Sequence, residues 1–402
     1  MLRTAVLIAA ACAAPALAQQ FEAVQLGTLG GPSSAAFGVN DNGAVVGAAD
    51  LPDGTFHAFI WENGVMTDLG TLGGEVSTAF SVNNAGVVVG RAKNAAGIDR
   101  AVRWFKAAQG VWQIEDLGTL NGDGSGFGWA TRINNAGQIV GYATSVQPYH
   151  GFIWENGVMT DVGTLGYTGN LAYSQALGIS DSGQVVGFAY RVLGGPEHGF
   201  VTHNGRQEDN TPIGSIAQAQ GHNINTSGVI GGYIADNTTG GAFRAGYMTQ
   251  RDGWTLIPLL DGTTDSYGYD INEAGEMVGV SFVASTPPLV LFRGYFFDGE
   301  QTLDLNDVTS GLPGTVIEAY DISDTRMIAA NADSFAGPIA LLIRPIGAPG
   351  CPADWDGSGG VDGDDIGAFF TDWQAGNADI DQSGGTDGDD ITVFFEHWQA
   401  GC

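Results

Sequence analysis

One hairpin signature returns seven times along this chain, and it constrains the fold more than any other feature. The first copy reads "AFGVNDNGAVVG", and the copies begin at Ala36, Ala79, Ala130, Ala176, Gly221, Gly268 and, in a degenerate form, Ala319. In each copy one Asn or Ser opens the turn, and we call it the anchor residue. The anchors are Asn40, Asn83, Asn134, Ser180, Asn225, Asn272 and Ser323. A repeat of 43 to 51 residues indicates one supersecondary unit that is used seven times.

Each copy contains four runs of strand length. In the first copy they are "AFGVN", "AVVGAA", "HAFIW" and "VMTDLGTL". Tight turns that contain Asn and Gly join the first run to the second and the third to the fourth. No long helical periodicity occurs before residue 360. Four antiparallel strands per copy and no helix predict an all-β fold, a seven-bladed β-propeller, with a seven-copy sandwich or solenoid as the alternative.

The two ends of the repeat region separate these alternatives. The last copy ends at Ile339–Ile346, a third strand with no fourth, whereas Phe21–Leu29 precedes the first hairpin and has no unit of its own. We therefore expect the N-terminal strand to complete the seventh blade, because a closed ring leaves no unpaired edge. The propeller then spans residues 19–346. Four residues before each anchor the chain always has Ala or Gly. We expect such small residues where the inner strands crowd around the axis, and a position in a tight core is the alternative.

The combined pattern "HAFIW.NG.M.DLGTLGG" and "VN..G.VVG" resembles the extracellular HAF repeat family of bacteria. The resemblance covers about residues 21–346 and is clearest in the first three copies. It implies export and a propeller-like fold. The function of that family is itself poorly defined, so the resemblance transfers no active site.

The first 18 residues have the features of a secretory signal peptide. Arg3 is followed by an apolar run, and "ALA" stands before Gln19, so we expect cleavage after Ala18. A short buried helix and a lipid anchor on Cys12 are the alternatives. No later run is apolar for the 18 or more residues that a membrane span needs. The mature protein is therefore expected to be soluble, and either secreted or held at the cell surface.

The charge of the chain excludes one class of partner. There are 44 acidic residues against 14 basic ones, for a formal net charge of −30. A surface this acidic repels phosphate backbones and anionic membranes, so we do not expect nucleic-acid binding.

No catalytic motif is present. The chain lacks G-x-S-x-G, H-E-x-x-H and a phosphate-binding loop. One repeat position at the start of the third strand holds either a His or an Arg, which favours a structural hydrogen-bond donor over a catalytic base. These residues are His57, His150, His198, Arg100, Arg244 and Arg293. His203 and His222 stand elsewhere and are also interpreted as structural.

The expected fold still indicates where a ligand binds. Both tight turns of every copy fall on one face, which we call the turn face. The opposite face, the loop face, carries connections that vary in length and composition, and such loops on a rigid scaffold are where binding usually occurs. Five residues before their anchors, Trp129 and Tyr267 are expected near the axis of this face. They are candidates to stack on a sugar or another flat ligand, or alternatively they cap the core.

A separate module follows the linker at residues 347–350. Residues 351–402 contain a duplication of period 25, and each copy matches a calcium loop, which needs oxygen ligands at positions 1, 3, 5, 7, 9 and 12 and Gly at position 6. The first set of ligands is Asp354, Asp356, Ser358, Gly360, Asp362 and Asp365. The second set is Asp379, Asp381, Ser383, Gly385, Asp387 and Asp390. The two sets predict two bound Ca²⁺ ions; an acidic disordered tail is the alternative.

One helix is expected after each loop, with apolar residues at i, i+3, i+4 and i+7 on one stripe. The two stripes, which we expect to pack together, are Ile366, Phe369, Phe370 and Trp373, and Ile391, Phe394, Phe395 and Trp398. Removal of the signal peptide leaves two cysteines, Cys351 and Cys402, which suggests one disulfide.

Tandem loop–helix units with Asp at position 12 resemble dockerin modules, and the flanking cysteines with the final "GC" resemble the GC-type dockerin ends of exported planctomycete proteins. The resemblance implies calcium-dependent folding and docking to a cohesin-like partner or surface anchor. Loop positions 10 and 11 depart from the usual Ser/Thr-type contact residues, since they are Gly363-Asp364 and Gly388-Asp389.

Two functions are compatible with this sequence. The first is an exported, monomeric, non-enzymatic binding or scaffold protein with a ligand-binding propeller and an anchoring tail. The alternative is a polysaccharide lyase or glycoside hydrolase that its dockerin delivers. Two or more carboxylates, or a His–Arg–carboxylate cluster, in one pocket of the loop face would favour the enzyme, and an apolar face would favour binding.

Overall fold

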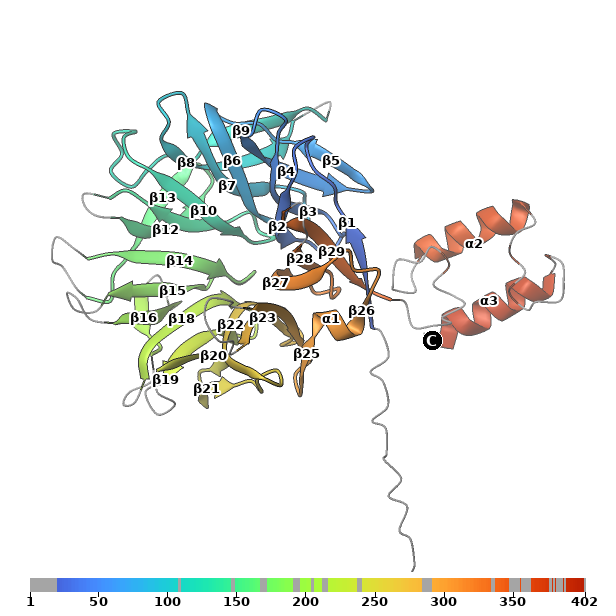
Figure 1. Ribbon diagram of the computed structural model, residues 1–402. Coiled ribbons are helices and arrows are strands. Elements are labelled where there is room, and N and C mark those ends of the chain that lie inside the picture. The colour runs from blue at the N-terminus through green and yellow to red at the C-terminus, as the bar shows by residue number, and fades with distance from the viewer. Residues whose placement is uncertain are drawn as a thin grey trace, which may run out of the picture.

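A computed structural model describes residues 20–107, 110–145, 149–166, 172–190, 196–203, 206–211, 216–236, 241–283, 291–333 and 337–346 of the repeat region. In the C-terminal segment it describes residues 355, 363–375, 378, 380, 386 and 388–400. Seven sheets, each with four antiparallel strands, surround a common axis, as Figure 1 shows. The predicted seven-bladed β-propeller is therefore confirmed.

Each blade takes its strands in chain order, from the innermost strand to the outermost. Blade 1 contains β2 (Ser34–Val39), β3 (Val45–Asp50), β4 (Phe56–Glu62) and β5 (Val65–Asp68). Blade 2 contains β6 (Gly73–Val82), β7 (Val88–Asn94), β8 (Asp99–Lys106) and β9 (Trp112–Asp116). Blade 3 contains β10 (Gly128–Ile133), β11 (Ile139–Ala143), β12 (His150–Glu155) and β13 (Val158–Gly163).

The next three blades repeat this order. Blade 4 contains β14 (Ser174–Ile179), β15 (Val185–Tyr190), β16 (Glu197–His203) and β17 (Arg206–Asp209). Blade 5 contains β18 (Ile216–Ile224), β19 (Ile230–Asp236), β20 (Ala242–Thr249) and β21 (Gly253–Leu256). Blade 6 contains β22 (Thr263–Ile271), β23 (Met277–Val283), β24 (Leu291–Phe297) and β25 (Thr302–Asp304).

The seventh blade closes the ring with both ends of the repeat region. It contains β27 (Thr315–Ile322), β28 (Ile328–Asp333) and β29 (Ile339–Pro345), and β1 (Phe21–Gln25) lies antiparallel to β29. The predicted N-terminal closure is thus confirmed. A short fifth strand, β26 (Thr309–Ser310), pairs in parallel with β1 after the four-residue helix α1 (Leu305–Val308), and neither was predicted.

The Ala or Gly four residues before each anchor packs between blades, which agrees with the tight-core alternative and corrects the expectation of crowding at the axis. Ala79 is fully buried against Val46 and Ala58 of the preceding blade. A Cβ at Gly268 would lie 2.6 Å from the carbonyl oxygen of Gly232, also in the preceding blade. The small side chain is needed because neighbouring sheets approach closely at this level.

In the C-terminal segment the structure describes two helices, α2 (Gly363–Ala375) and α3 (Gly388–Ala400). The two predicted stripes pack together, with the rings of Phe369 and Phe394 stacked at 4.1 Å between centroids. Cys351 and Cys402 lie outside the described residues, as do all the predicted calcium ligands except Asp365 and Asp390. Within the described parts of the chain, no helix is long and apolar enough to cross a membrane.

Candidate functional site

A β-bulge in the innermost strand of every blade determines which side chains reach the axis. The register between the first and second strands shifts three residues before the anchor in all seven blades. The extra residues are Phe37, Phe80, Thr131, Leu177, His222, Tyr269 and Tyr320. A bulge redirects side chains that strict alternation would separate. All seven extra residues line a cavity of about 350 Å³ on the axis, which we call the loop-face cavity.

The same bulge explains the glycine of the "VVG" motif. A Cβ at Gly141 would lie 2.0 Å from the carbonyl oxygen of Trp129, because the bulged strand crosses close to its neighbour. The equivalent approach, 1.9 to 2.0 Å, occurs at Gly47, Gly90, Gly187, Gly232 and Gly279. Glycine is used here because the backbone leaves no room for a side chain.

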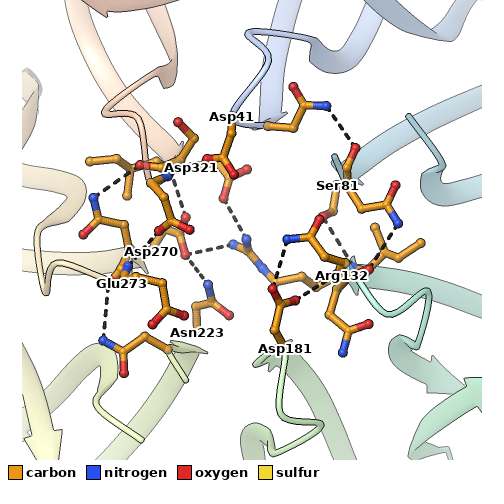
Figure 2. Close-up of a pocket in the computed structure, with 18 of the residues that line it drawn as sticks. Asp41, Ser81, Arg132, Asp181, Asn223, Asp270, Glu273 and Asp321 are labelled. Atoms are coloured by element: carbon orange, nitrogen blue, oxygen red, sulfur yellow. Dashed lines mark hydrogen bonds and ion pairs between the residues drawn. The ribbon is translucent and has the colours of Figure 1, made fainter. Parts of the chain in front are cut away.

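Three charged residues that stand two positions before their anchors form a cluster across the central channel, which we call the brace. They are Arg132, Asp270 and Asp321. Nη1 of Arg132 donates to Oδ1 of Asp321 at 2.8 Å, and its Nη2 lies 3.2 Å from Oδ1 of Asp270. The backbone N–H groups of Val39 and Ile322 donate to the other carboxylate oxygens. Figure 2 shows Arg132 reaching across the axis toward these carboxylates. The three residues line a smaller cavity of about 120 Å³, which we call the turn-face cavity.

The electrostatics of the brace indicate a structural role. Burial raises the pKa of Asp270, Arg132 opposes that shift, and Asp321 adds to it. Burial alone would lower the pKa of Arg132, but the two carboxylates more than offset it and raise it. Because all four carboxylate oxygens of Asp270 and Asp321 already accept hydrogen bonds or pair with Arg132, neither is available as a general base.

On the turn face, the five Asn anchors each join their blade to the next. Oδ1 of Asn83 accepts from the N–H of Val87 at 2.9 Å in its own turn, and Nδ2 donates to the carbonyl of Asn134 in the next blade at 3.2 Å. The same pair of bonds is made by Asn40, Asn134, Asn225 and Asn272. An Asn anchor therefore stabilises its own turn and also bonds to the next blade. Only its role in the turn was predicted from the sequence.

The residue after each anchor adds a second ring of bonds. The backbone N–H of Asp41 donates to Oδ1 of Asn84 at 3.1 Å, and the last blade returns to the first through the N–H of Asp324 and Oδ1 of Asp41 at 2.8 Å. Bonds of this kind occur at six of the seven blade junctions. The polar side chains in Figure 2 are thus already engaged with one another.

The loop-face cavity has a different character, because its wall is an arc of aromatic rings. Contacts between centroids run from Trp129 to Phe80 at 5.8 Å, on to Phe37 at 6.0 Å, and to Tyr320 at 5.1 Å. Tyr269 stacks on Tyr320 at 5.2 Å. The lining on the side of blades 3 and 4 is completed by Thr131, Arg132, Tyr142, Gln175 and Leu177. Such a wall offers large apolar surface with hydroxyl and amide groups at its edges.

His222 is a polar group in this wall. Burial and the charge of Arg132 lower its pKa to about 4, so the imidazole is neutral near pH 7. Its buried Nε2 has no hydrogen-bond partner among the described residues. From the sequence His222 was interpreted as structural, and the bulge places it among the residues that line the cavity.

The structure separates the two candidate stacking residues. Trp129 lines the loop-face cavity, where Arg91 lies 4.4 Å over its ring. Tyr267 is not among the lining residues and packs against Tyr233, Phe243 and Phe282. Most of the wall was not predicted from the sequence. The sequence feature that could have identified it is an aromatic residue three positions before the anchor in four copies, namely Phe37, Phe80, Tyr269 and Tyr320.

The repeated His or Arg position holds the outer strand of its blade. Nδ1 of His57, His150 and His198 lies 2.8 to 3.0 Å from a carboxylate oxygen of Asp68, Asp161 and Asp209. Arg100 and Arg293 pair with Asp116 and Asp304 in the same way. The prediction of a structural hydrogen-bond donor is confirmed at these five positions.

Comparisons with known proteins identify no family. No protein-family model matches the chain, and no curated protein matches it. A puromycin-hydrolysing peptidase of Mycobacterium tuberculosis is 10% identical with a TM-score of 0.47, over 81% of this chain and 54% of the peptidase. An acylaminoacyl peptidase of Pyrococcus horikoshii is 10% identical with a TM-score of 0.42, over 75% of this chain and 50% of that one.

AofleA from Arthrobotrys oligospora is 11% identical with a TM-score of 0.40, over 71% of this chain and 88% of AofleA. The chain spans about half the length of the two peptidases. Likenesses at this level carry no argument about activity, and the propeller assignment depends on the order of the strands in the seven sheets.

Proposed function

We propose that this protein is an exported carbohydrate-binding protein that holds a neutral saccharide in the loop-face cavity. The observation that carries the proposal is the aromatic wall formed by Phe37, Phe80, Trp129, Tyr269 and Tyr320. Pyranose rings present apolar C–H faces and hydroxyl edges, which match aromatic faces flanked by a few polar groups. The net charge of −30 disfavours polyanionic glycans.

A hydrolase or lyase is the weaker alternative. Glycoside hydrolysis uses a pair of carboxyl groups that flank the bond to be cleaved. Arg132 and His222 line the loop-face cavity, but none of its described lining residues is Asp or Glu. The nearby Asp270 and Asp321 are held by Arg132 and by backbone N–H groups, so no carboxylate completes a His–Arg–carboxylate cluster in this cavity. The geometry therefore favours binding without turnover.

A glycan-array screen of the full chain, followed by calorimetry and turnover assays on the same glycans, tests this function. Trp129→Ala should weaken binding of an array-positive neutral glycan at least tenfold, because it removes part of the cavity wall. Tyr267→Ala is the matched control, since Tyr267 holds the same repeat position but does not line the cavity; its affinity should stay within about twofold. Equal affinities for the two variants, or release of cleaved product, would contradict the proposal.

We also assign the repeats to the HAF family and the C-terminal segment to a dockerin-like anchor that binds two Ca²⁺ ions. In support, Asp365 and Asp390 hold the last ligand position of the two loops, and both are fully buried in the first turns of α2 and α3. Oδ1 of Asp390 accepts from the backbone N–H of Ile380 at 2.9 Å. Two carboxylates at equivalent loop positions, together with the other predicted loop oxygens, match the hard oxygen ligands that Ca²⁺ prefers.

Chelation tests this assignment. EDTA should remove most of the helical circular-dichroism signal of residues 351–402 while the propeller keeps its β signal, because metal binding and folding are coupled in a module this small. Re-addition of Ca²⁺ should restore the helices. An unchanged helical signal in EDTA would refute the calcium assignment. Binding to a cohesin-like partner or surface anchor is expected only with Ca²⁺ present.

A further inference from the structure

We propose that the bound saccharide is an extended neutral polysaccharide that leaves the loop-face cavity across blades 3 and 4. This inference rests on the proposed function and specifies its ligand class. The residues that carry it are four tyrosines, Tyr142, Tyr149, Tyr173 and Tyr190, which we call the outer aromatic track.

The track is continuous with the cavity wall. Trp129 contacts Tyr142 at 5.6 Å between centroids, and both line the cavity. From there the ring contacts continue to Tyr149 at 5.6 Å, Tyr173 at 5.2 Å and Tyr190 at 4.1 Å. All four tyrosines are partly exposed. Tyr142 and Tyr190 lie at or next to the loop-face ends of β11 and β15, and Tyr149 and Tyr173 directly precede β12 and β14. The four tyrosines therefore form a row on the face where the cavity opens.

Neighbouring aromatic rings pack against the tyrosines of the track, and a hydrogen bond joins the track to a residue that lines the cavity. Phe127 packs edge-on against Tyr142 and Tyr149, and Phe188 packs edge-on against Tyr173. Nε2 of Gln175, a lining residue of the cavity, donates to the hydroxyl of Tyr149 at 3.3 Å. Side chains held in this way lose little further conformational entropy when a ligand lies on them.

A polar cluster fixes the outer end of the track. The hydroxyl of Tyr173 donates to Oε1 of Glu197 at 2.7 Å. Nε2 of Gln220 donates to Oε2 of the same carboxylate at 2.6 Å, and Gln218 donates there as well. Glu197 therefore joins blade 4 to blade 5 and orients Tyr173. Its partly exposed carboxylate also gives sugar hydroxyls an acceptor beyond the last rings.

A chain-like ligand explains this arrangement better than a single sugar. The cavity alone is large enough for a small ligand, and the track adds a row of aromatic faces outside it. Aromatic side chains provide much contact area at low entropic cost. The strong negative charge of the protein selects against acidic polymers on the same surface.

Titration calorimetry with the full chain tests the inference. The probes are hexamers and dimers of β-linked glucose, xylose and mannose, with polygalacturonate as the acidic control. We expect at least one hexamer to bind at least tenfold more tightly than its dimer, and polygalacturonate not to bind. Tyr149→Ala and Tyr173→Ala should each reduce hexamer affinity about three- to tenfold and leave dimer affinity unchanged.

Tyr173→Phe is the matched control, since it keeps the ring and removes the hydroxyl that binds Glu197; its loss should be smaller than that of Tyr173→Ala. Thermal unfolding of each variant confirms that it is folded. Hexamer and dimer of equal affinity, with no effect of either Ala variant, would overturn the track and leave the cavity intact. If no neutral oligomer binds, the proposed function fails together with the inference. If polygalacturonate binds best, the neutral-ligand assignment is wrong.

Discussion

The two ends of the propeller channel are built differently from the same repeat. At the turn face, anchor amides and the residues that follow them bond blade to blade in a nearly complete ring. At the loop face, the residues three before the anchors are mostly aromatic and leave an open cavity. Between the two ends, Arg132 closes the channel with Asp270 and Asp321.

This difference shows how a repeat protein separates closure from recognition. Positions where the copies mostly agree, such as the anchors, make the same bond between blades at five of the seven junctions and stabilise the ring. Positions where the copies differ, such as Thr131, Leu177 and His222, sit on a redirected part of the strand and face the cavity. We therefore expect turn-face substitutions to change stability and loop-face substitutions to change binding.

The largest effect is expected from Arg132→Met, which leaves Asp270 and Asp321 buried without their cation. Removing one partner of a buried ion pair costs about 3–5 kcal/mol, and urea denaturation should show a loss of that size. Arg251→Ala is the control, because Arg251 is 91% exposed in its pair with Asp252 and should change stability by less than about 0.5 kcal/mol. A loss for Arg132→Met as small as the control would show that the brace contributes nothing to closure.

The second largest effect is a pH dependence from His222. Its pKa of about 4 in the folded protein lies below the ordinary value of 6.5, so the unfolded chain binds the proton first as pH falls. Stability should decrease as the pH falls from 7 to 4, by about 3 kcal/mol from this group. His222→Gln should remove that part of the slope. Parallel pH–stability curves for the two proteins would contradict the assignment.

An intermediate effect is expected at the anchors. Asn83→Ala removes both the turn bond and the bond to the next blade, and leaves buried partners unsatisfied, which costs about 2 kcal/mol. Asn83→Ser should cost about half as much, since Ser180 and Ser323 show that a hydroxyl can accept the turn bond. Chemical denaturation of both variants measures the difference. If Ser is no better than Ala, the turn bond is not the part that matters.

The smallest effect on stability is expected at the ion pair of His150 with Asp161. The hydrogen bond to Asp161 raises the pKa of His150, with burial acting in the opposite direction. The stabilisation from this pair is therefore complete below pH 6.5 and is lost as the pH rises through the higher folded value, by less than about 1 kcal/mol because the pair is half exposed. Comparison of wild type with Asp161→Asn at pH 5.5 and pH 8.5 measures it, and a larger penalty at pH 8.5 would reverse the sign.

The fold was predictable because the sequence pattern of each strand and turn occurs seven times. In addition, Phe21–Leu29 supplies the strand that is missing after Ile339–Ile346. The residues that line the axis were not predictable in the same way. Regular alternation along a strand assigns every second residue to one face, whereas a bulge places two successive residues on that face. Trp129 was identified because it is aromatic at a position read by alternation. The brace had a signal that was not used: Arg132, Asp270 and Asp321 occupy one repeat position in three copies.

The strand pairing of β1 with β29 has a consequence for how this molecule is made. Phe21 emerges from the ribosome early, and its partner Pro345 emerges more than 300 residues later. The pairing of β1 with β29, which closes the ring, is therefore the last part of the propeller that can form. Until then the edge of β29 is open, and the β1 strand of a second molecule can occupy it equally well. Concentrated refolding should therefore produce strand-exchanged dimers that dilute refolding avoids.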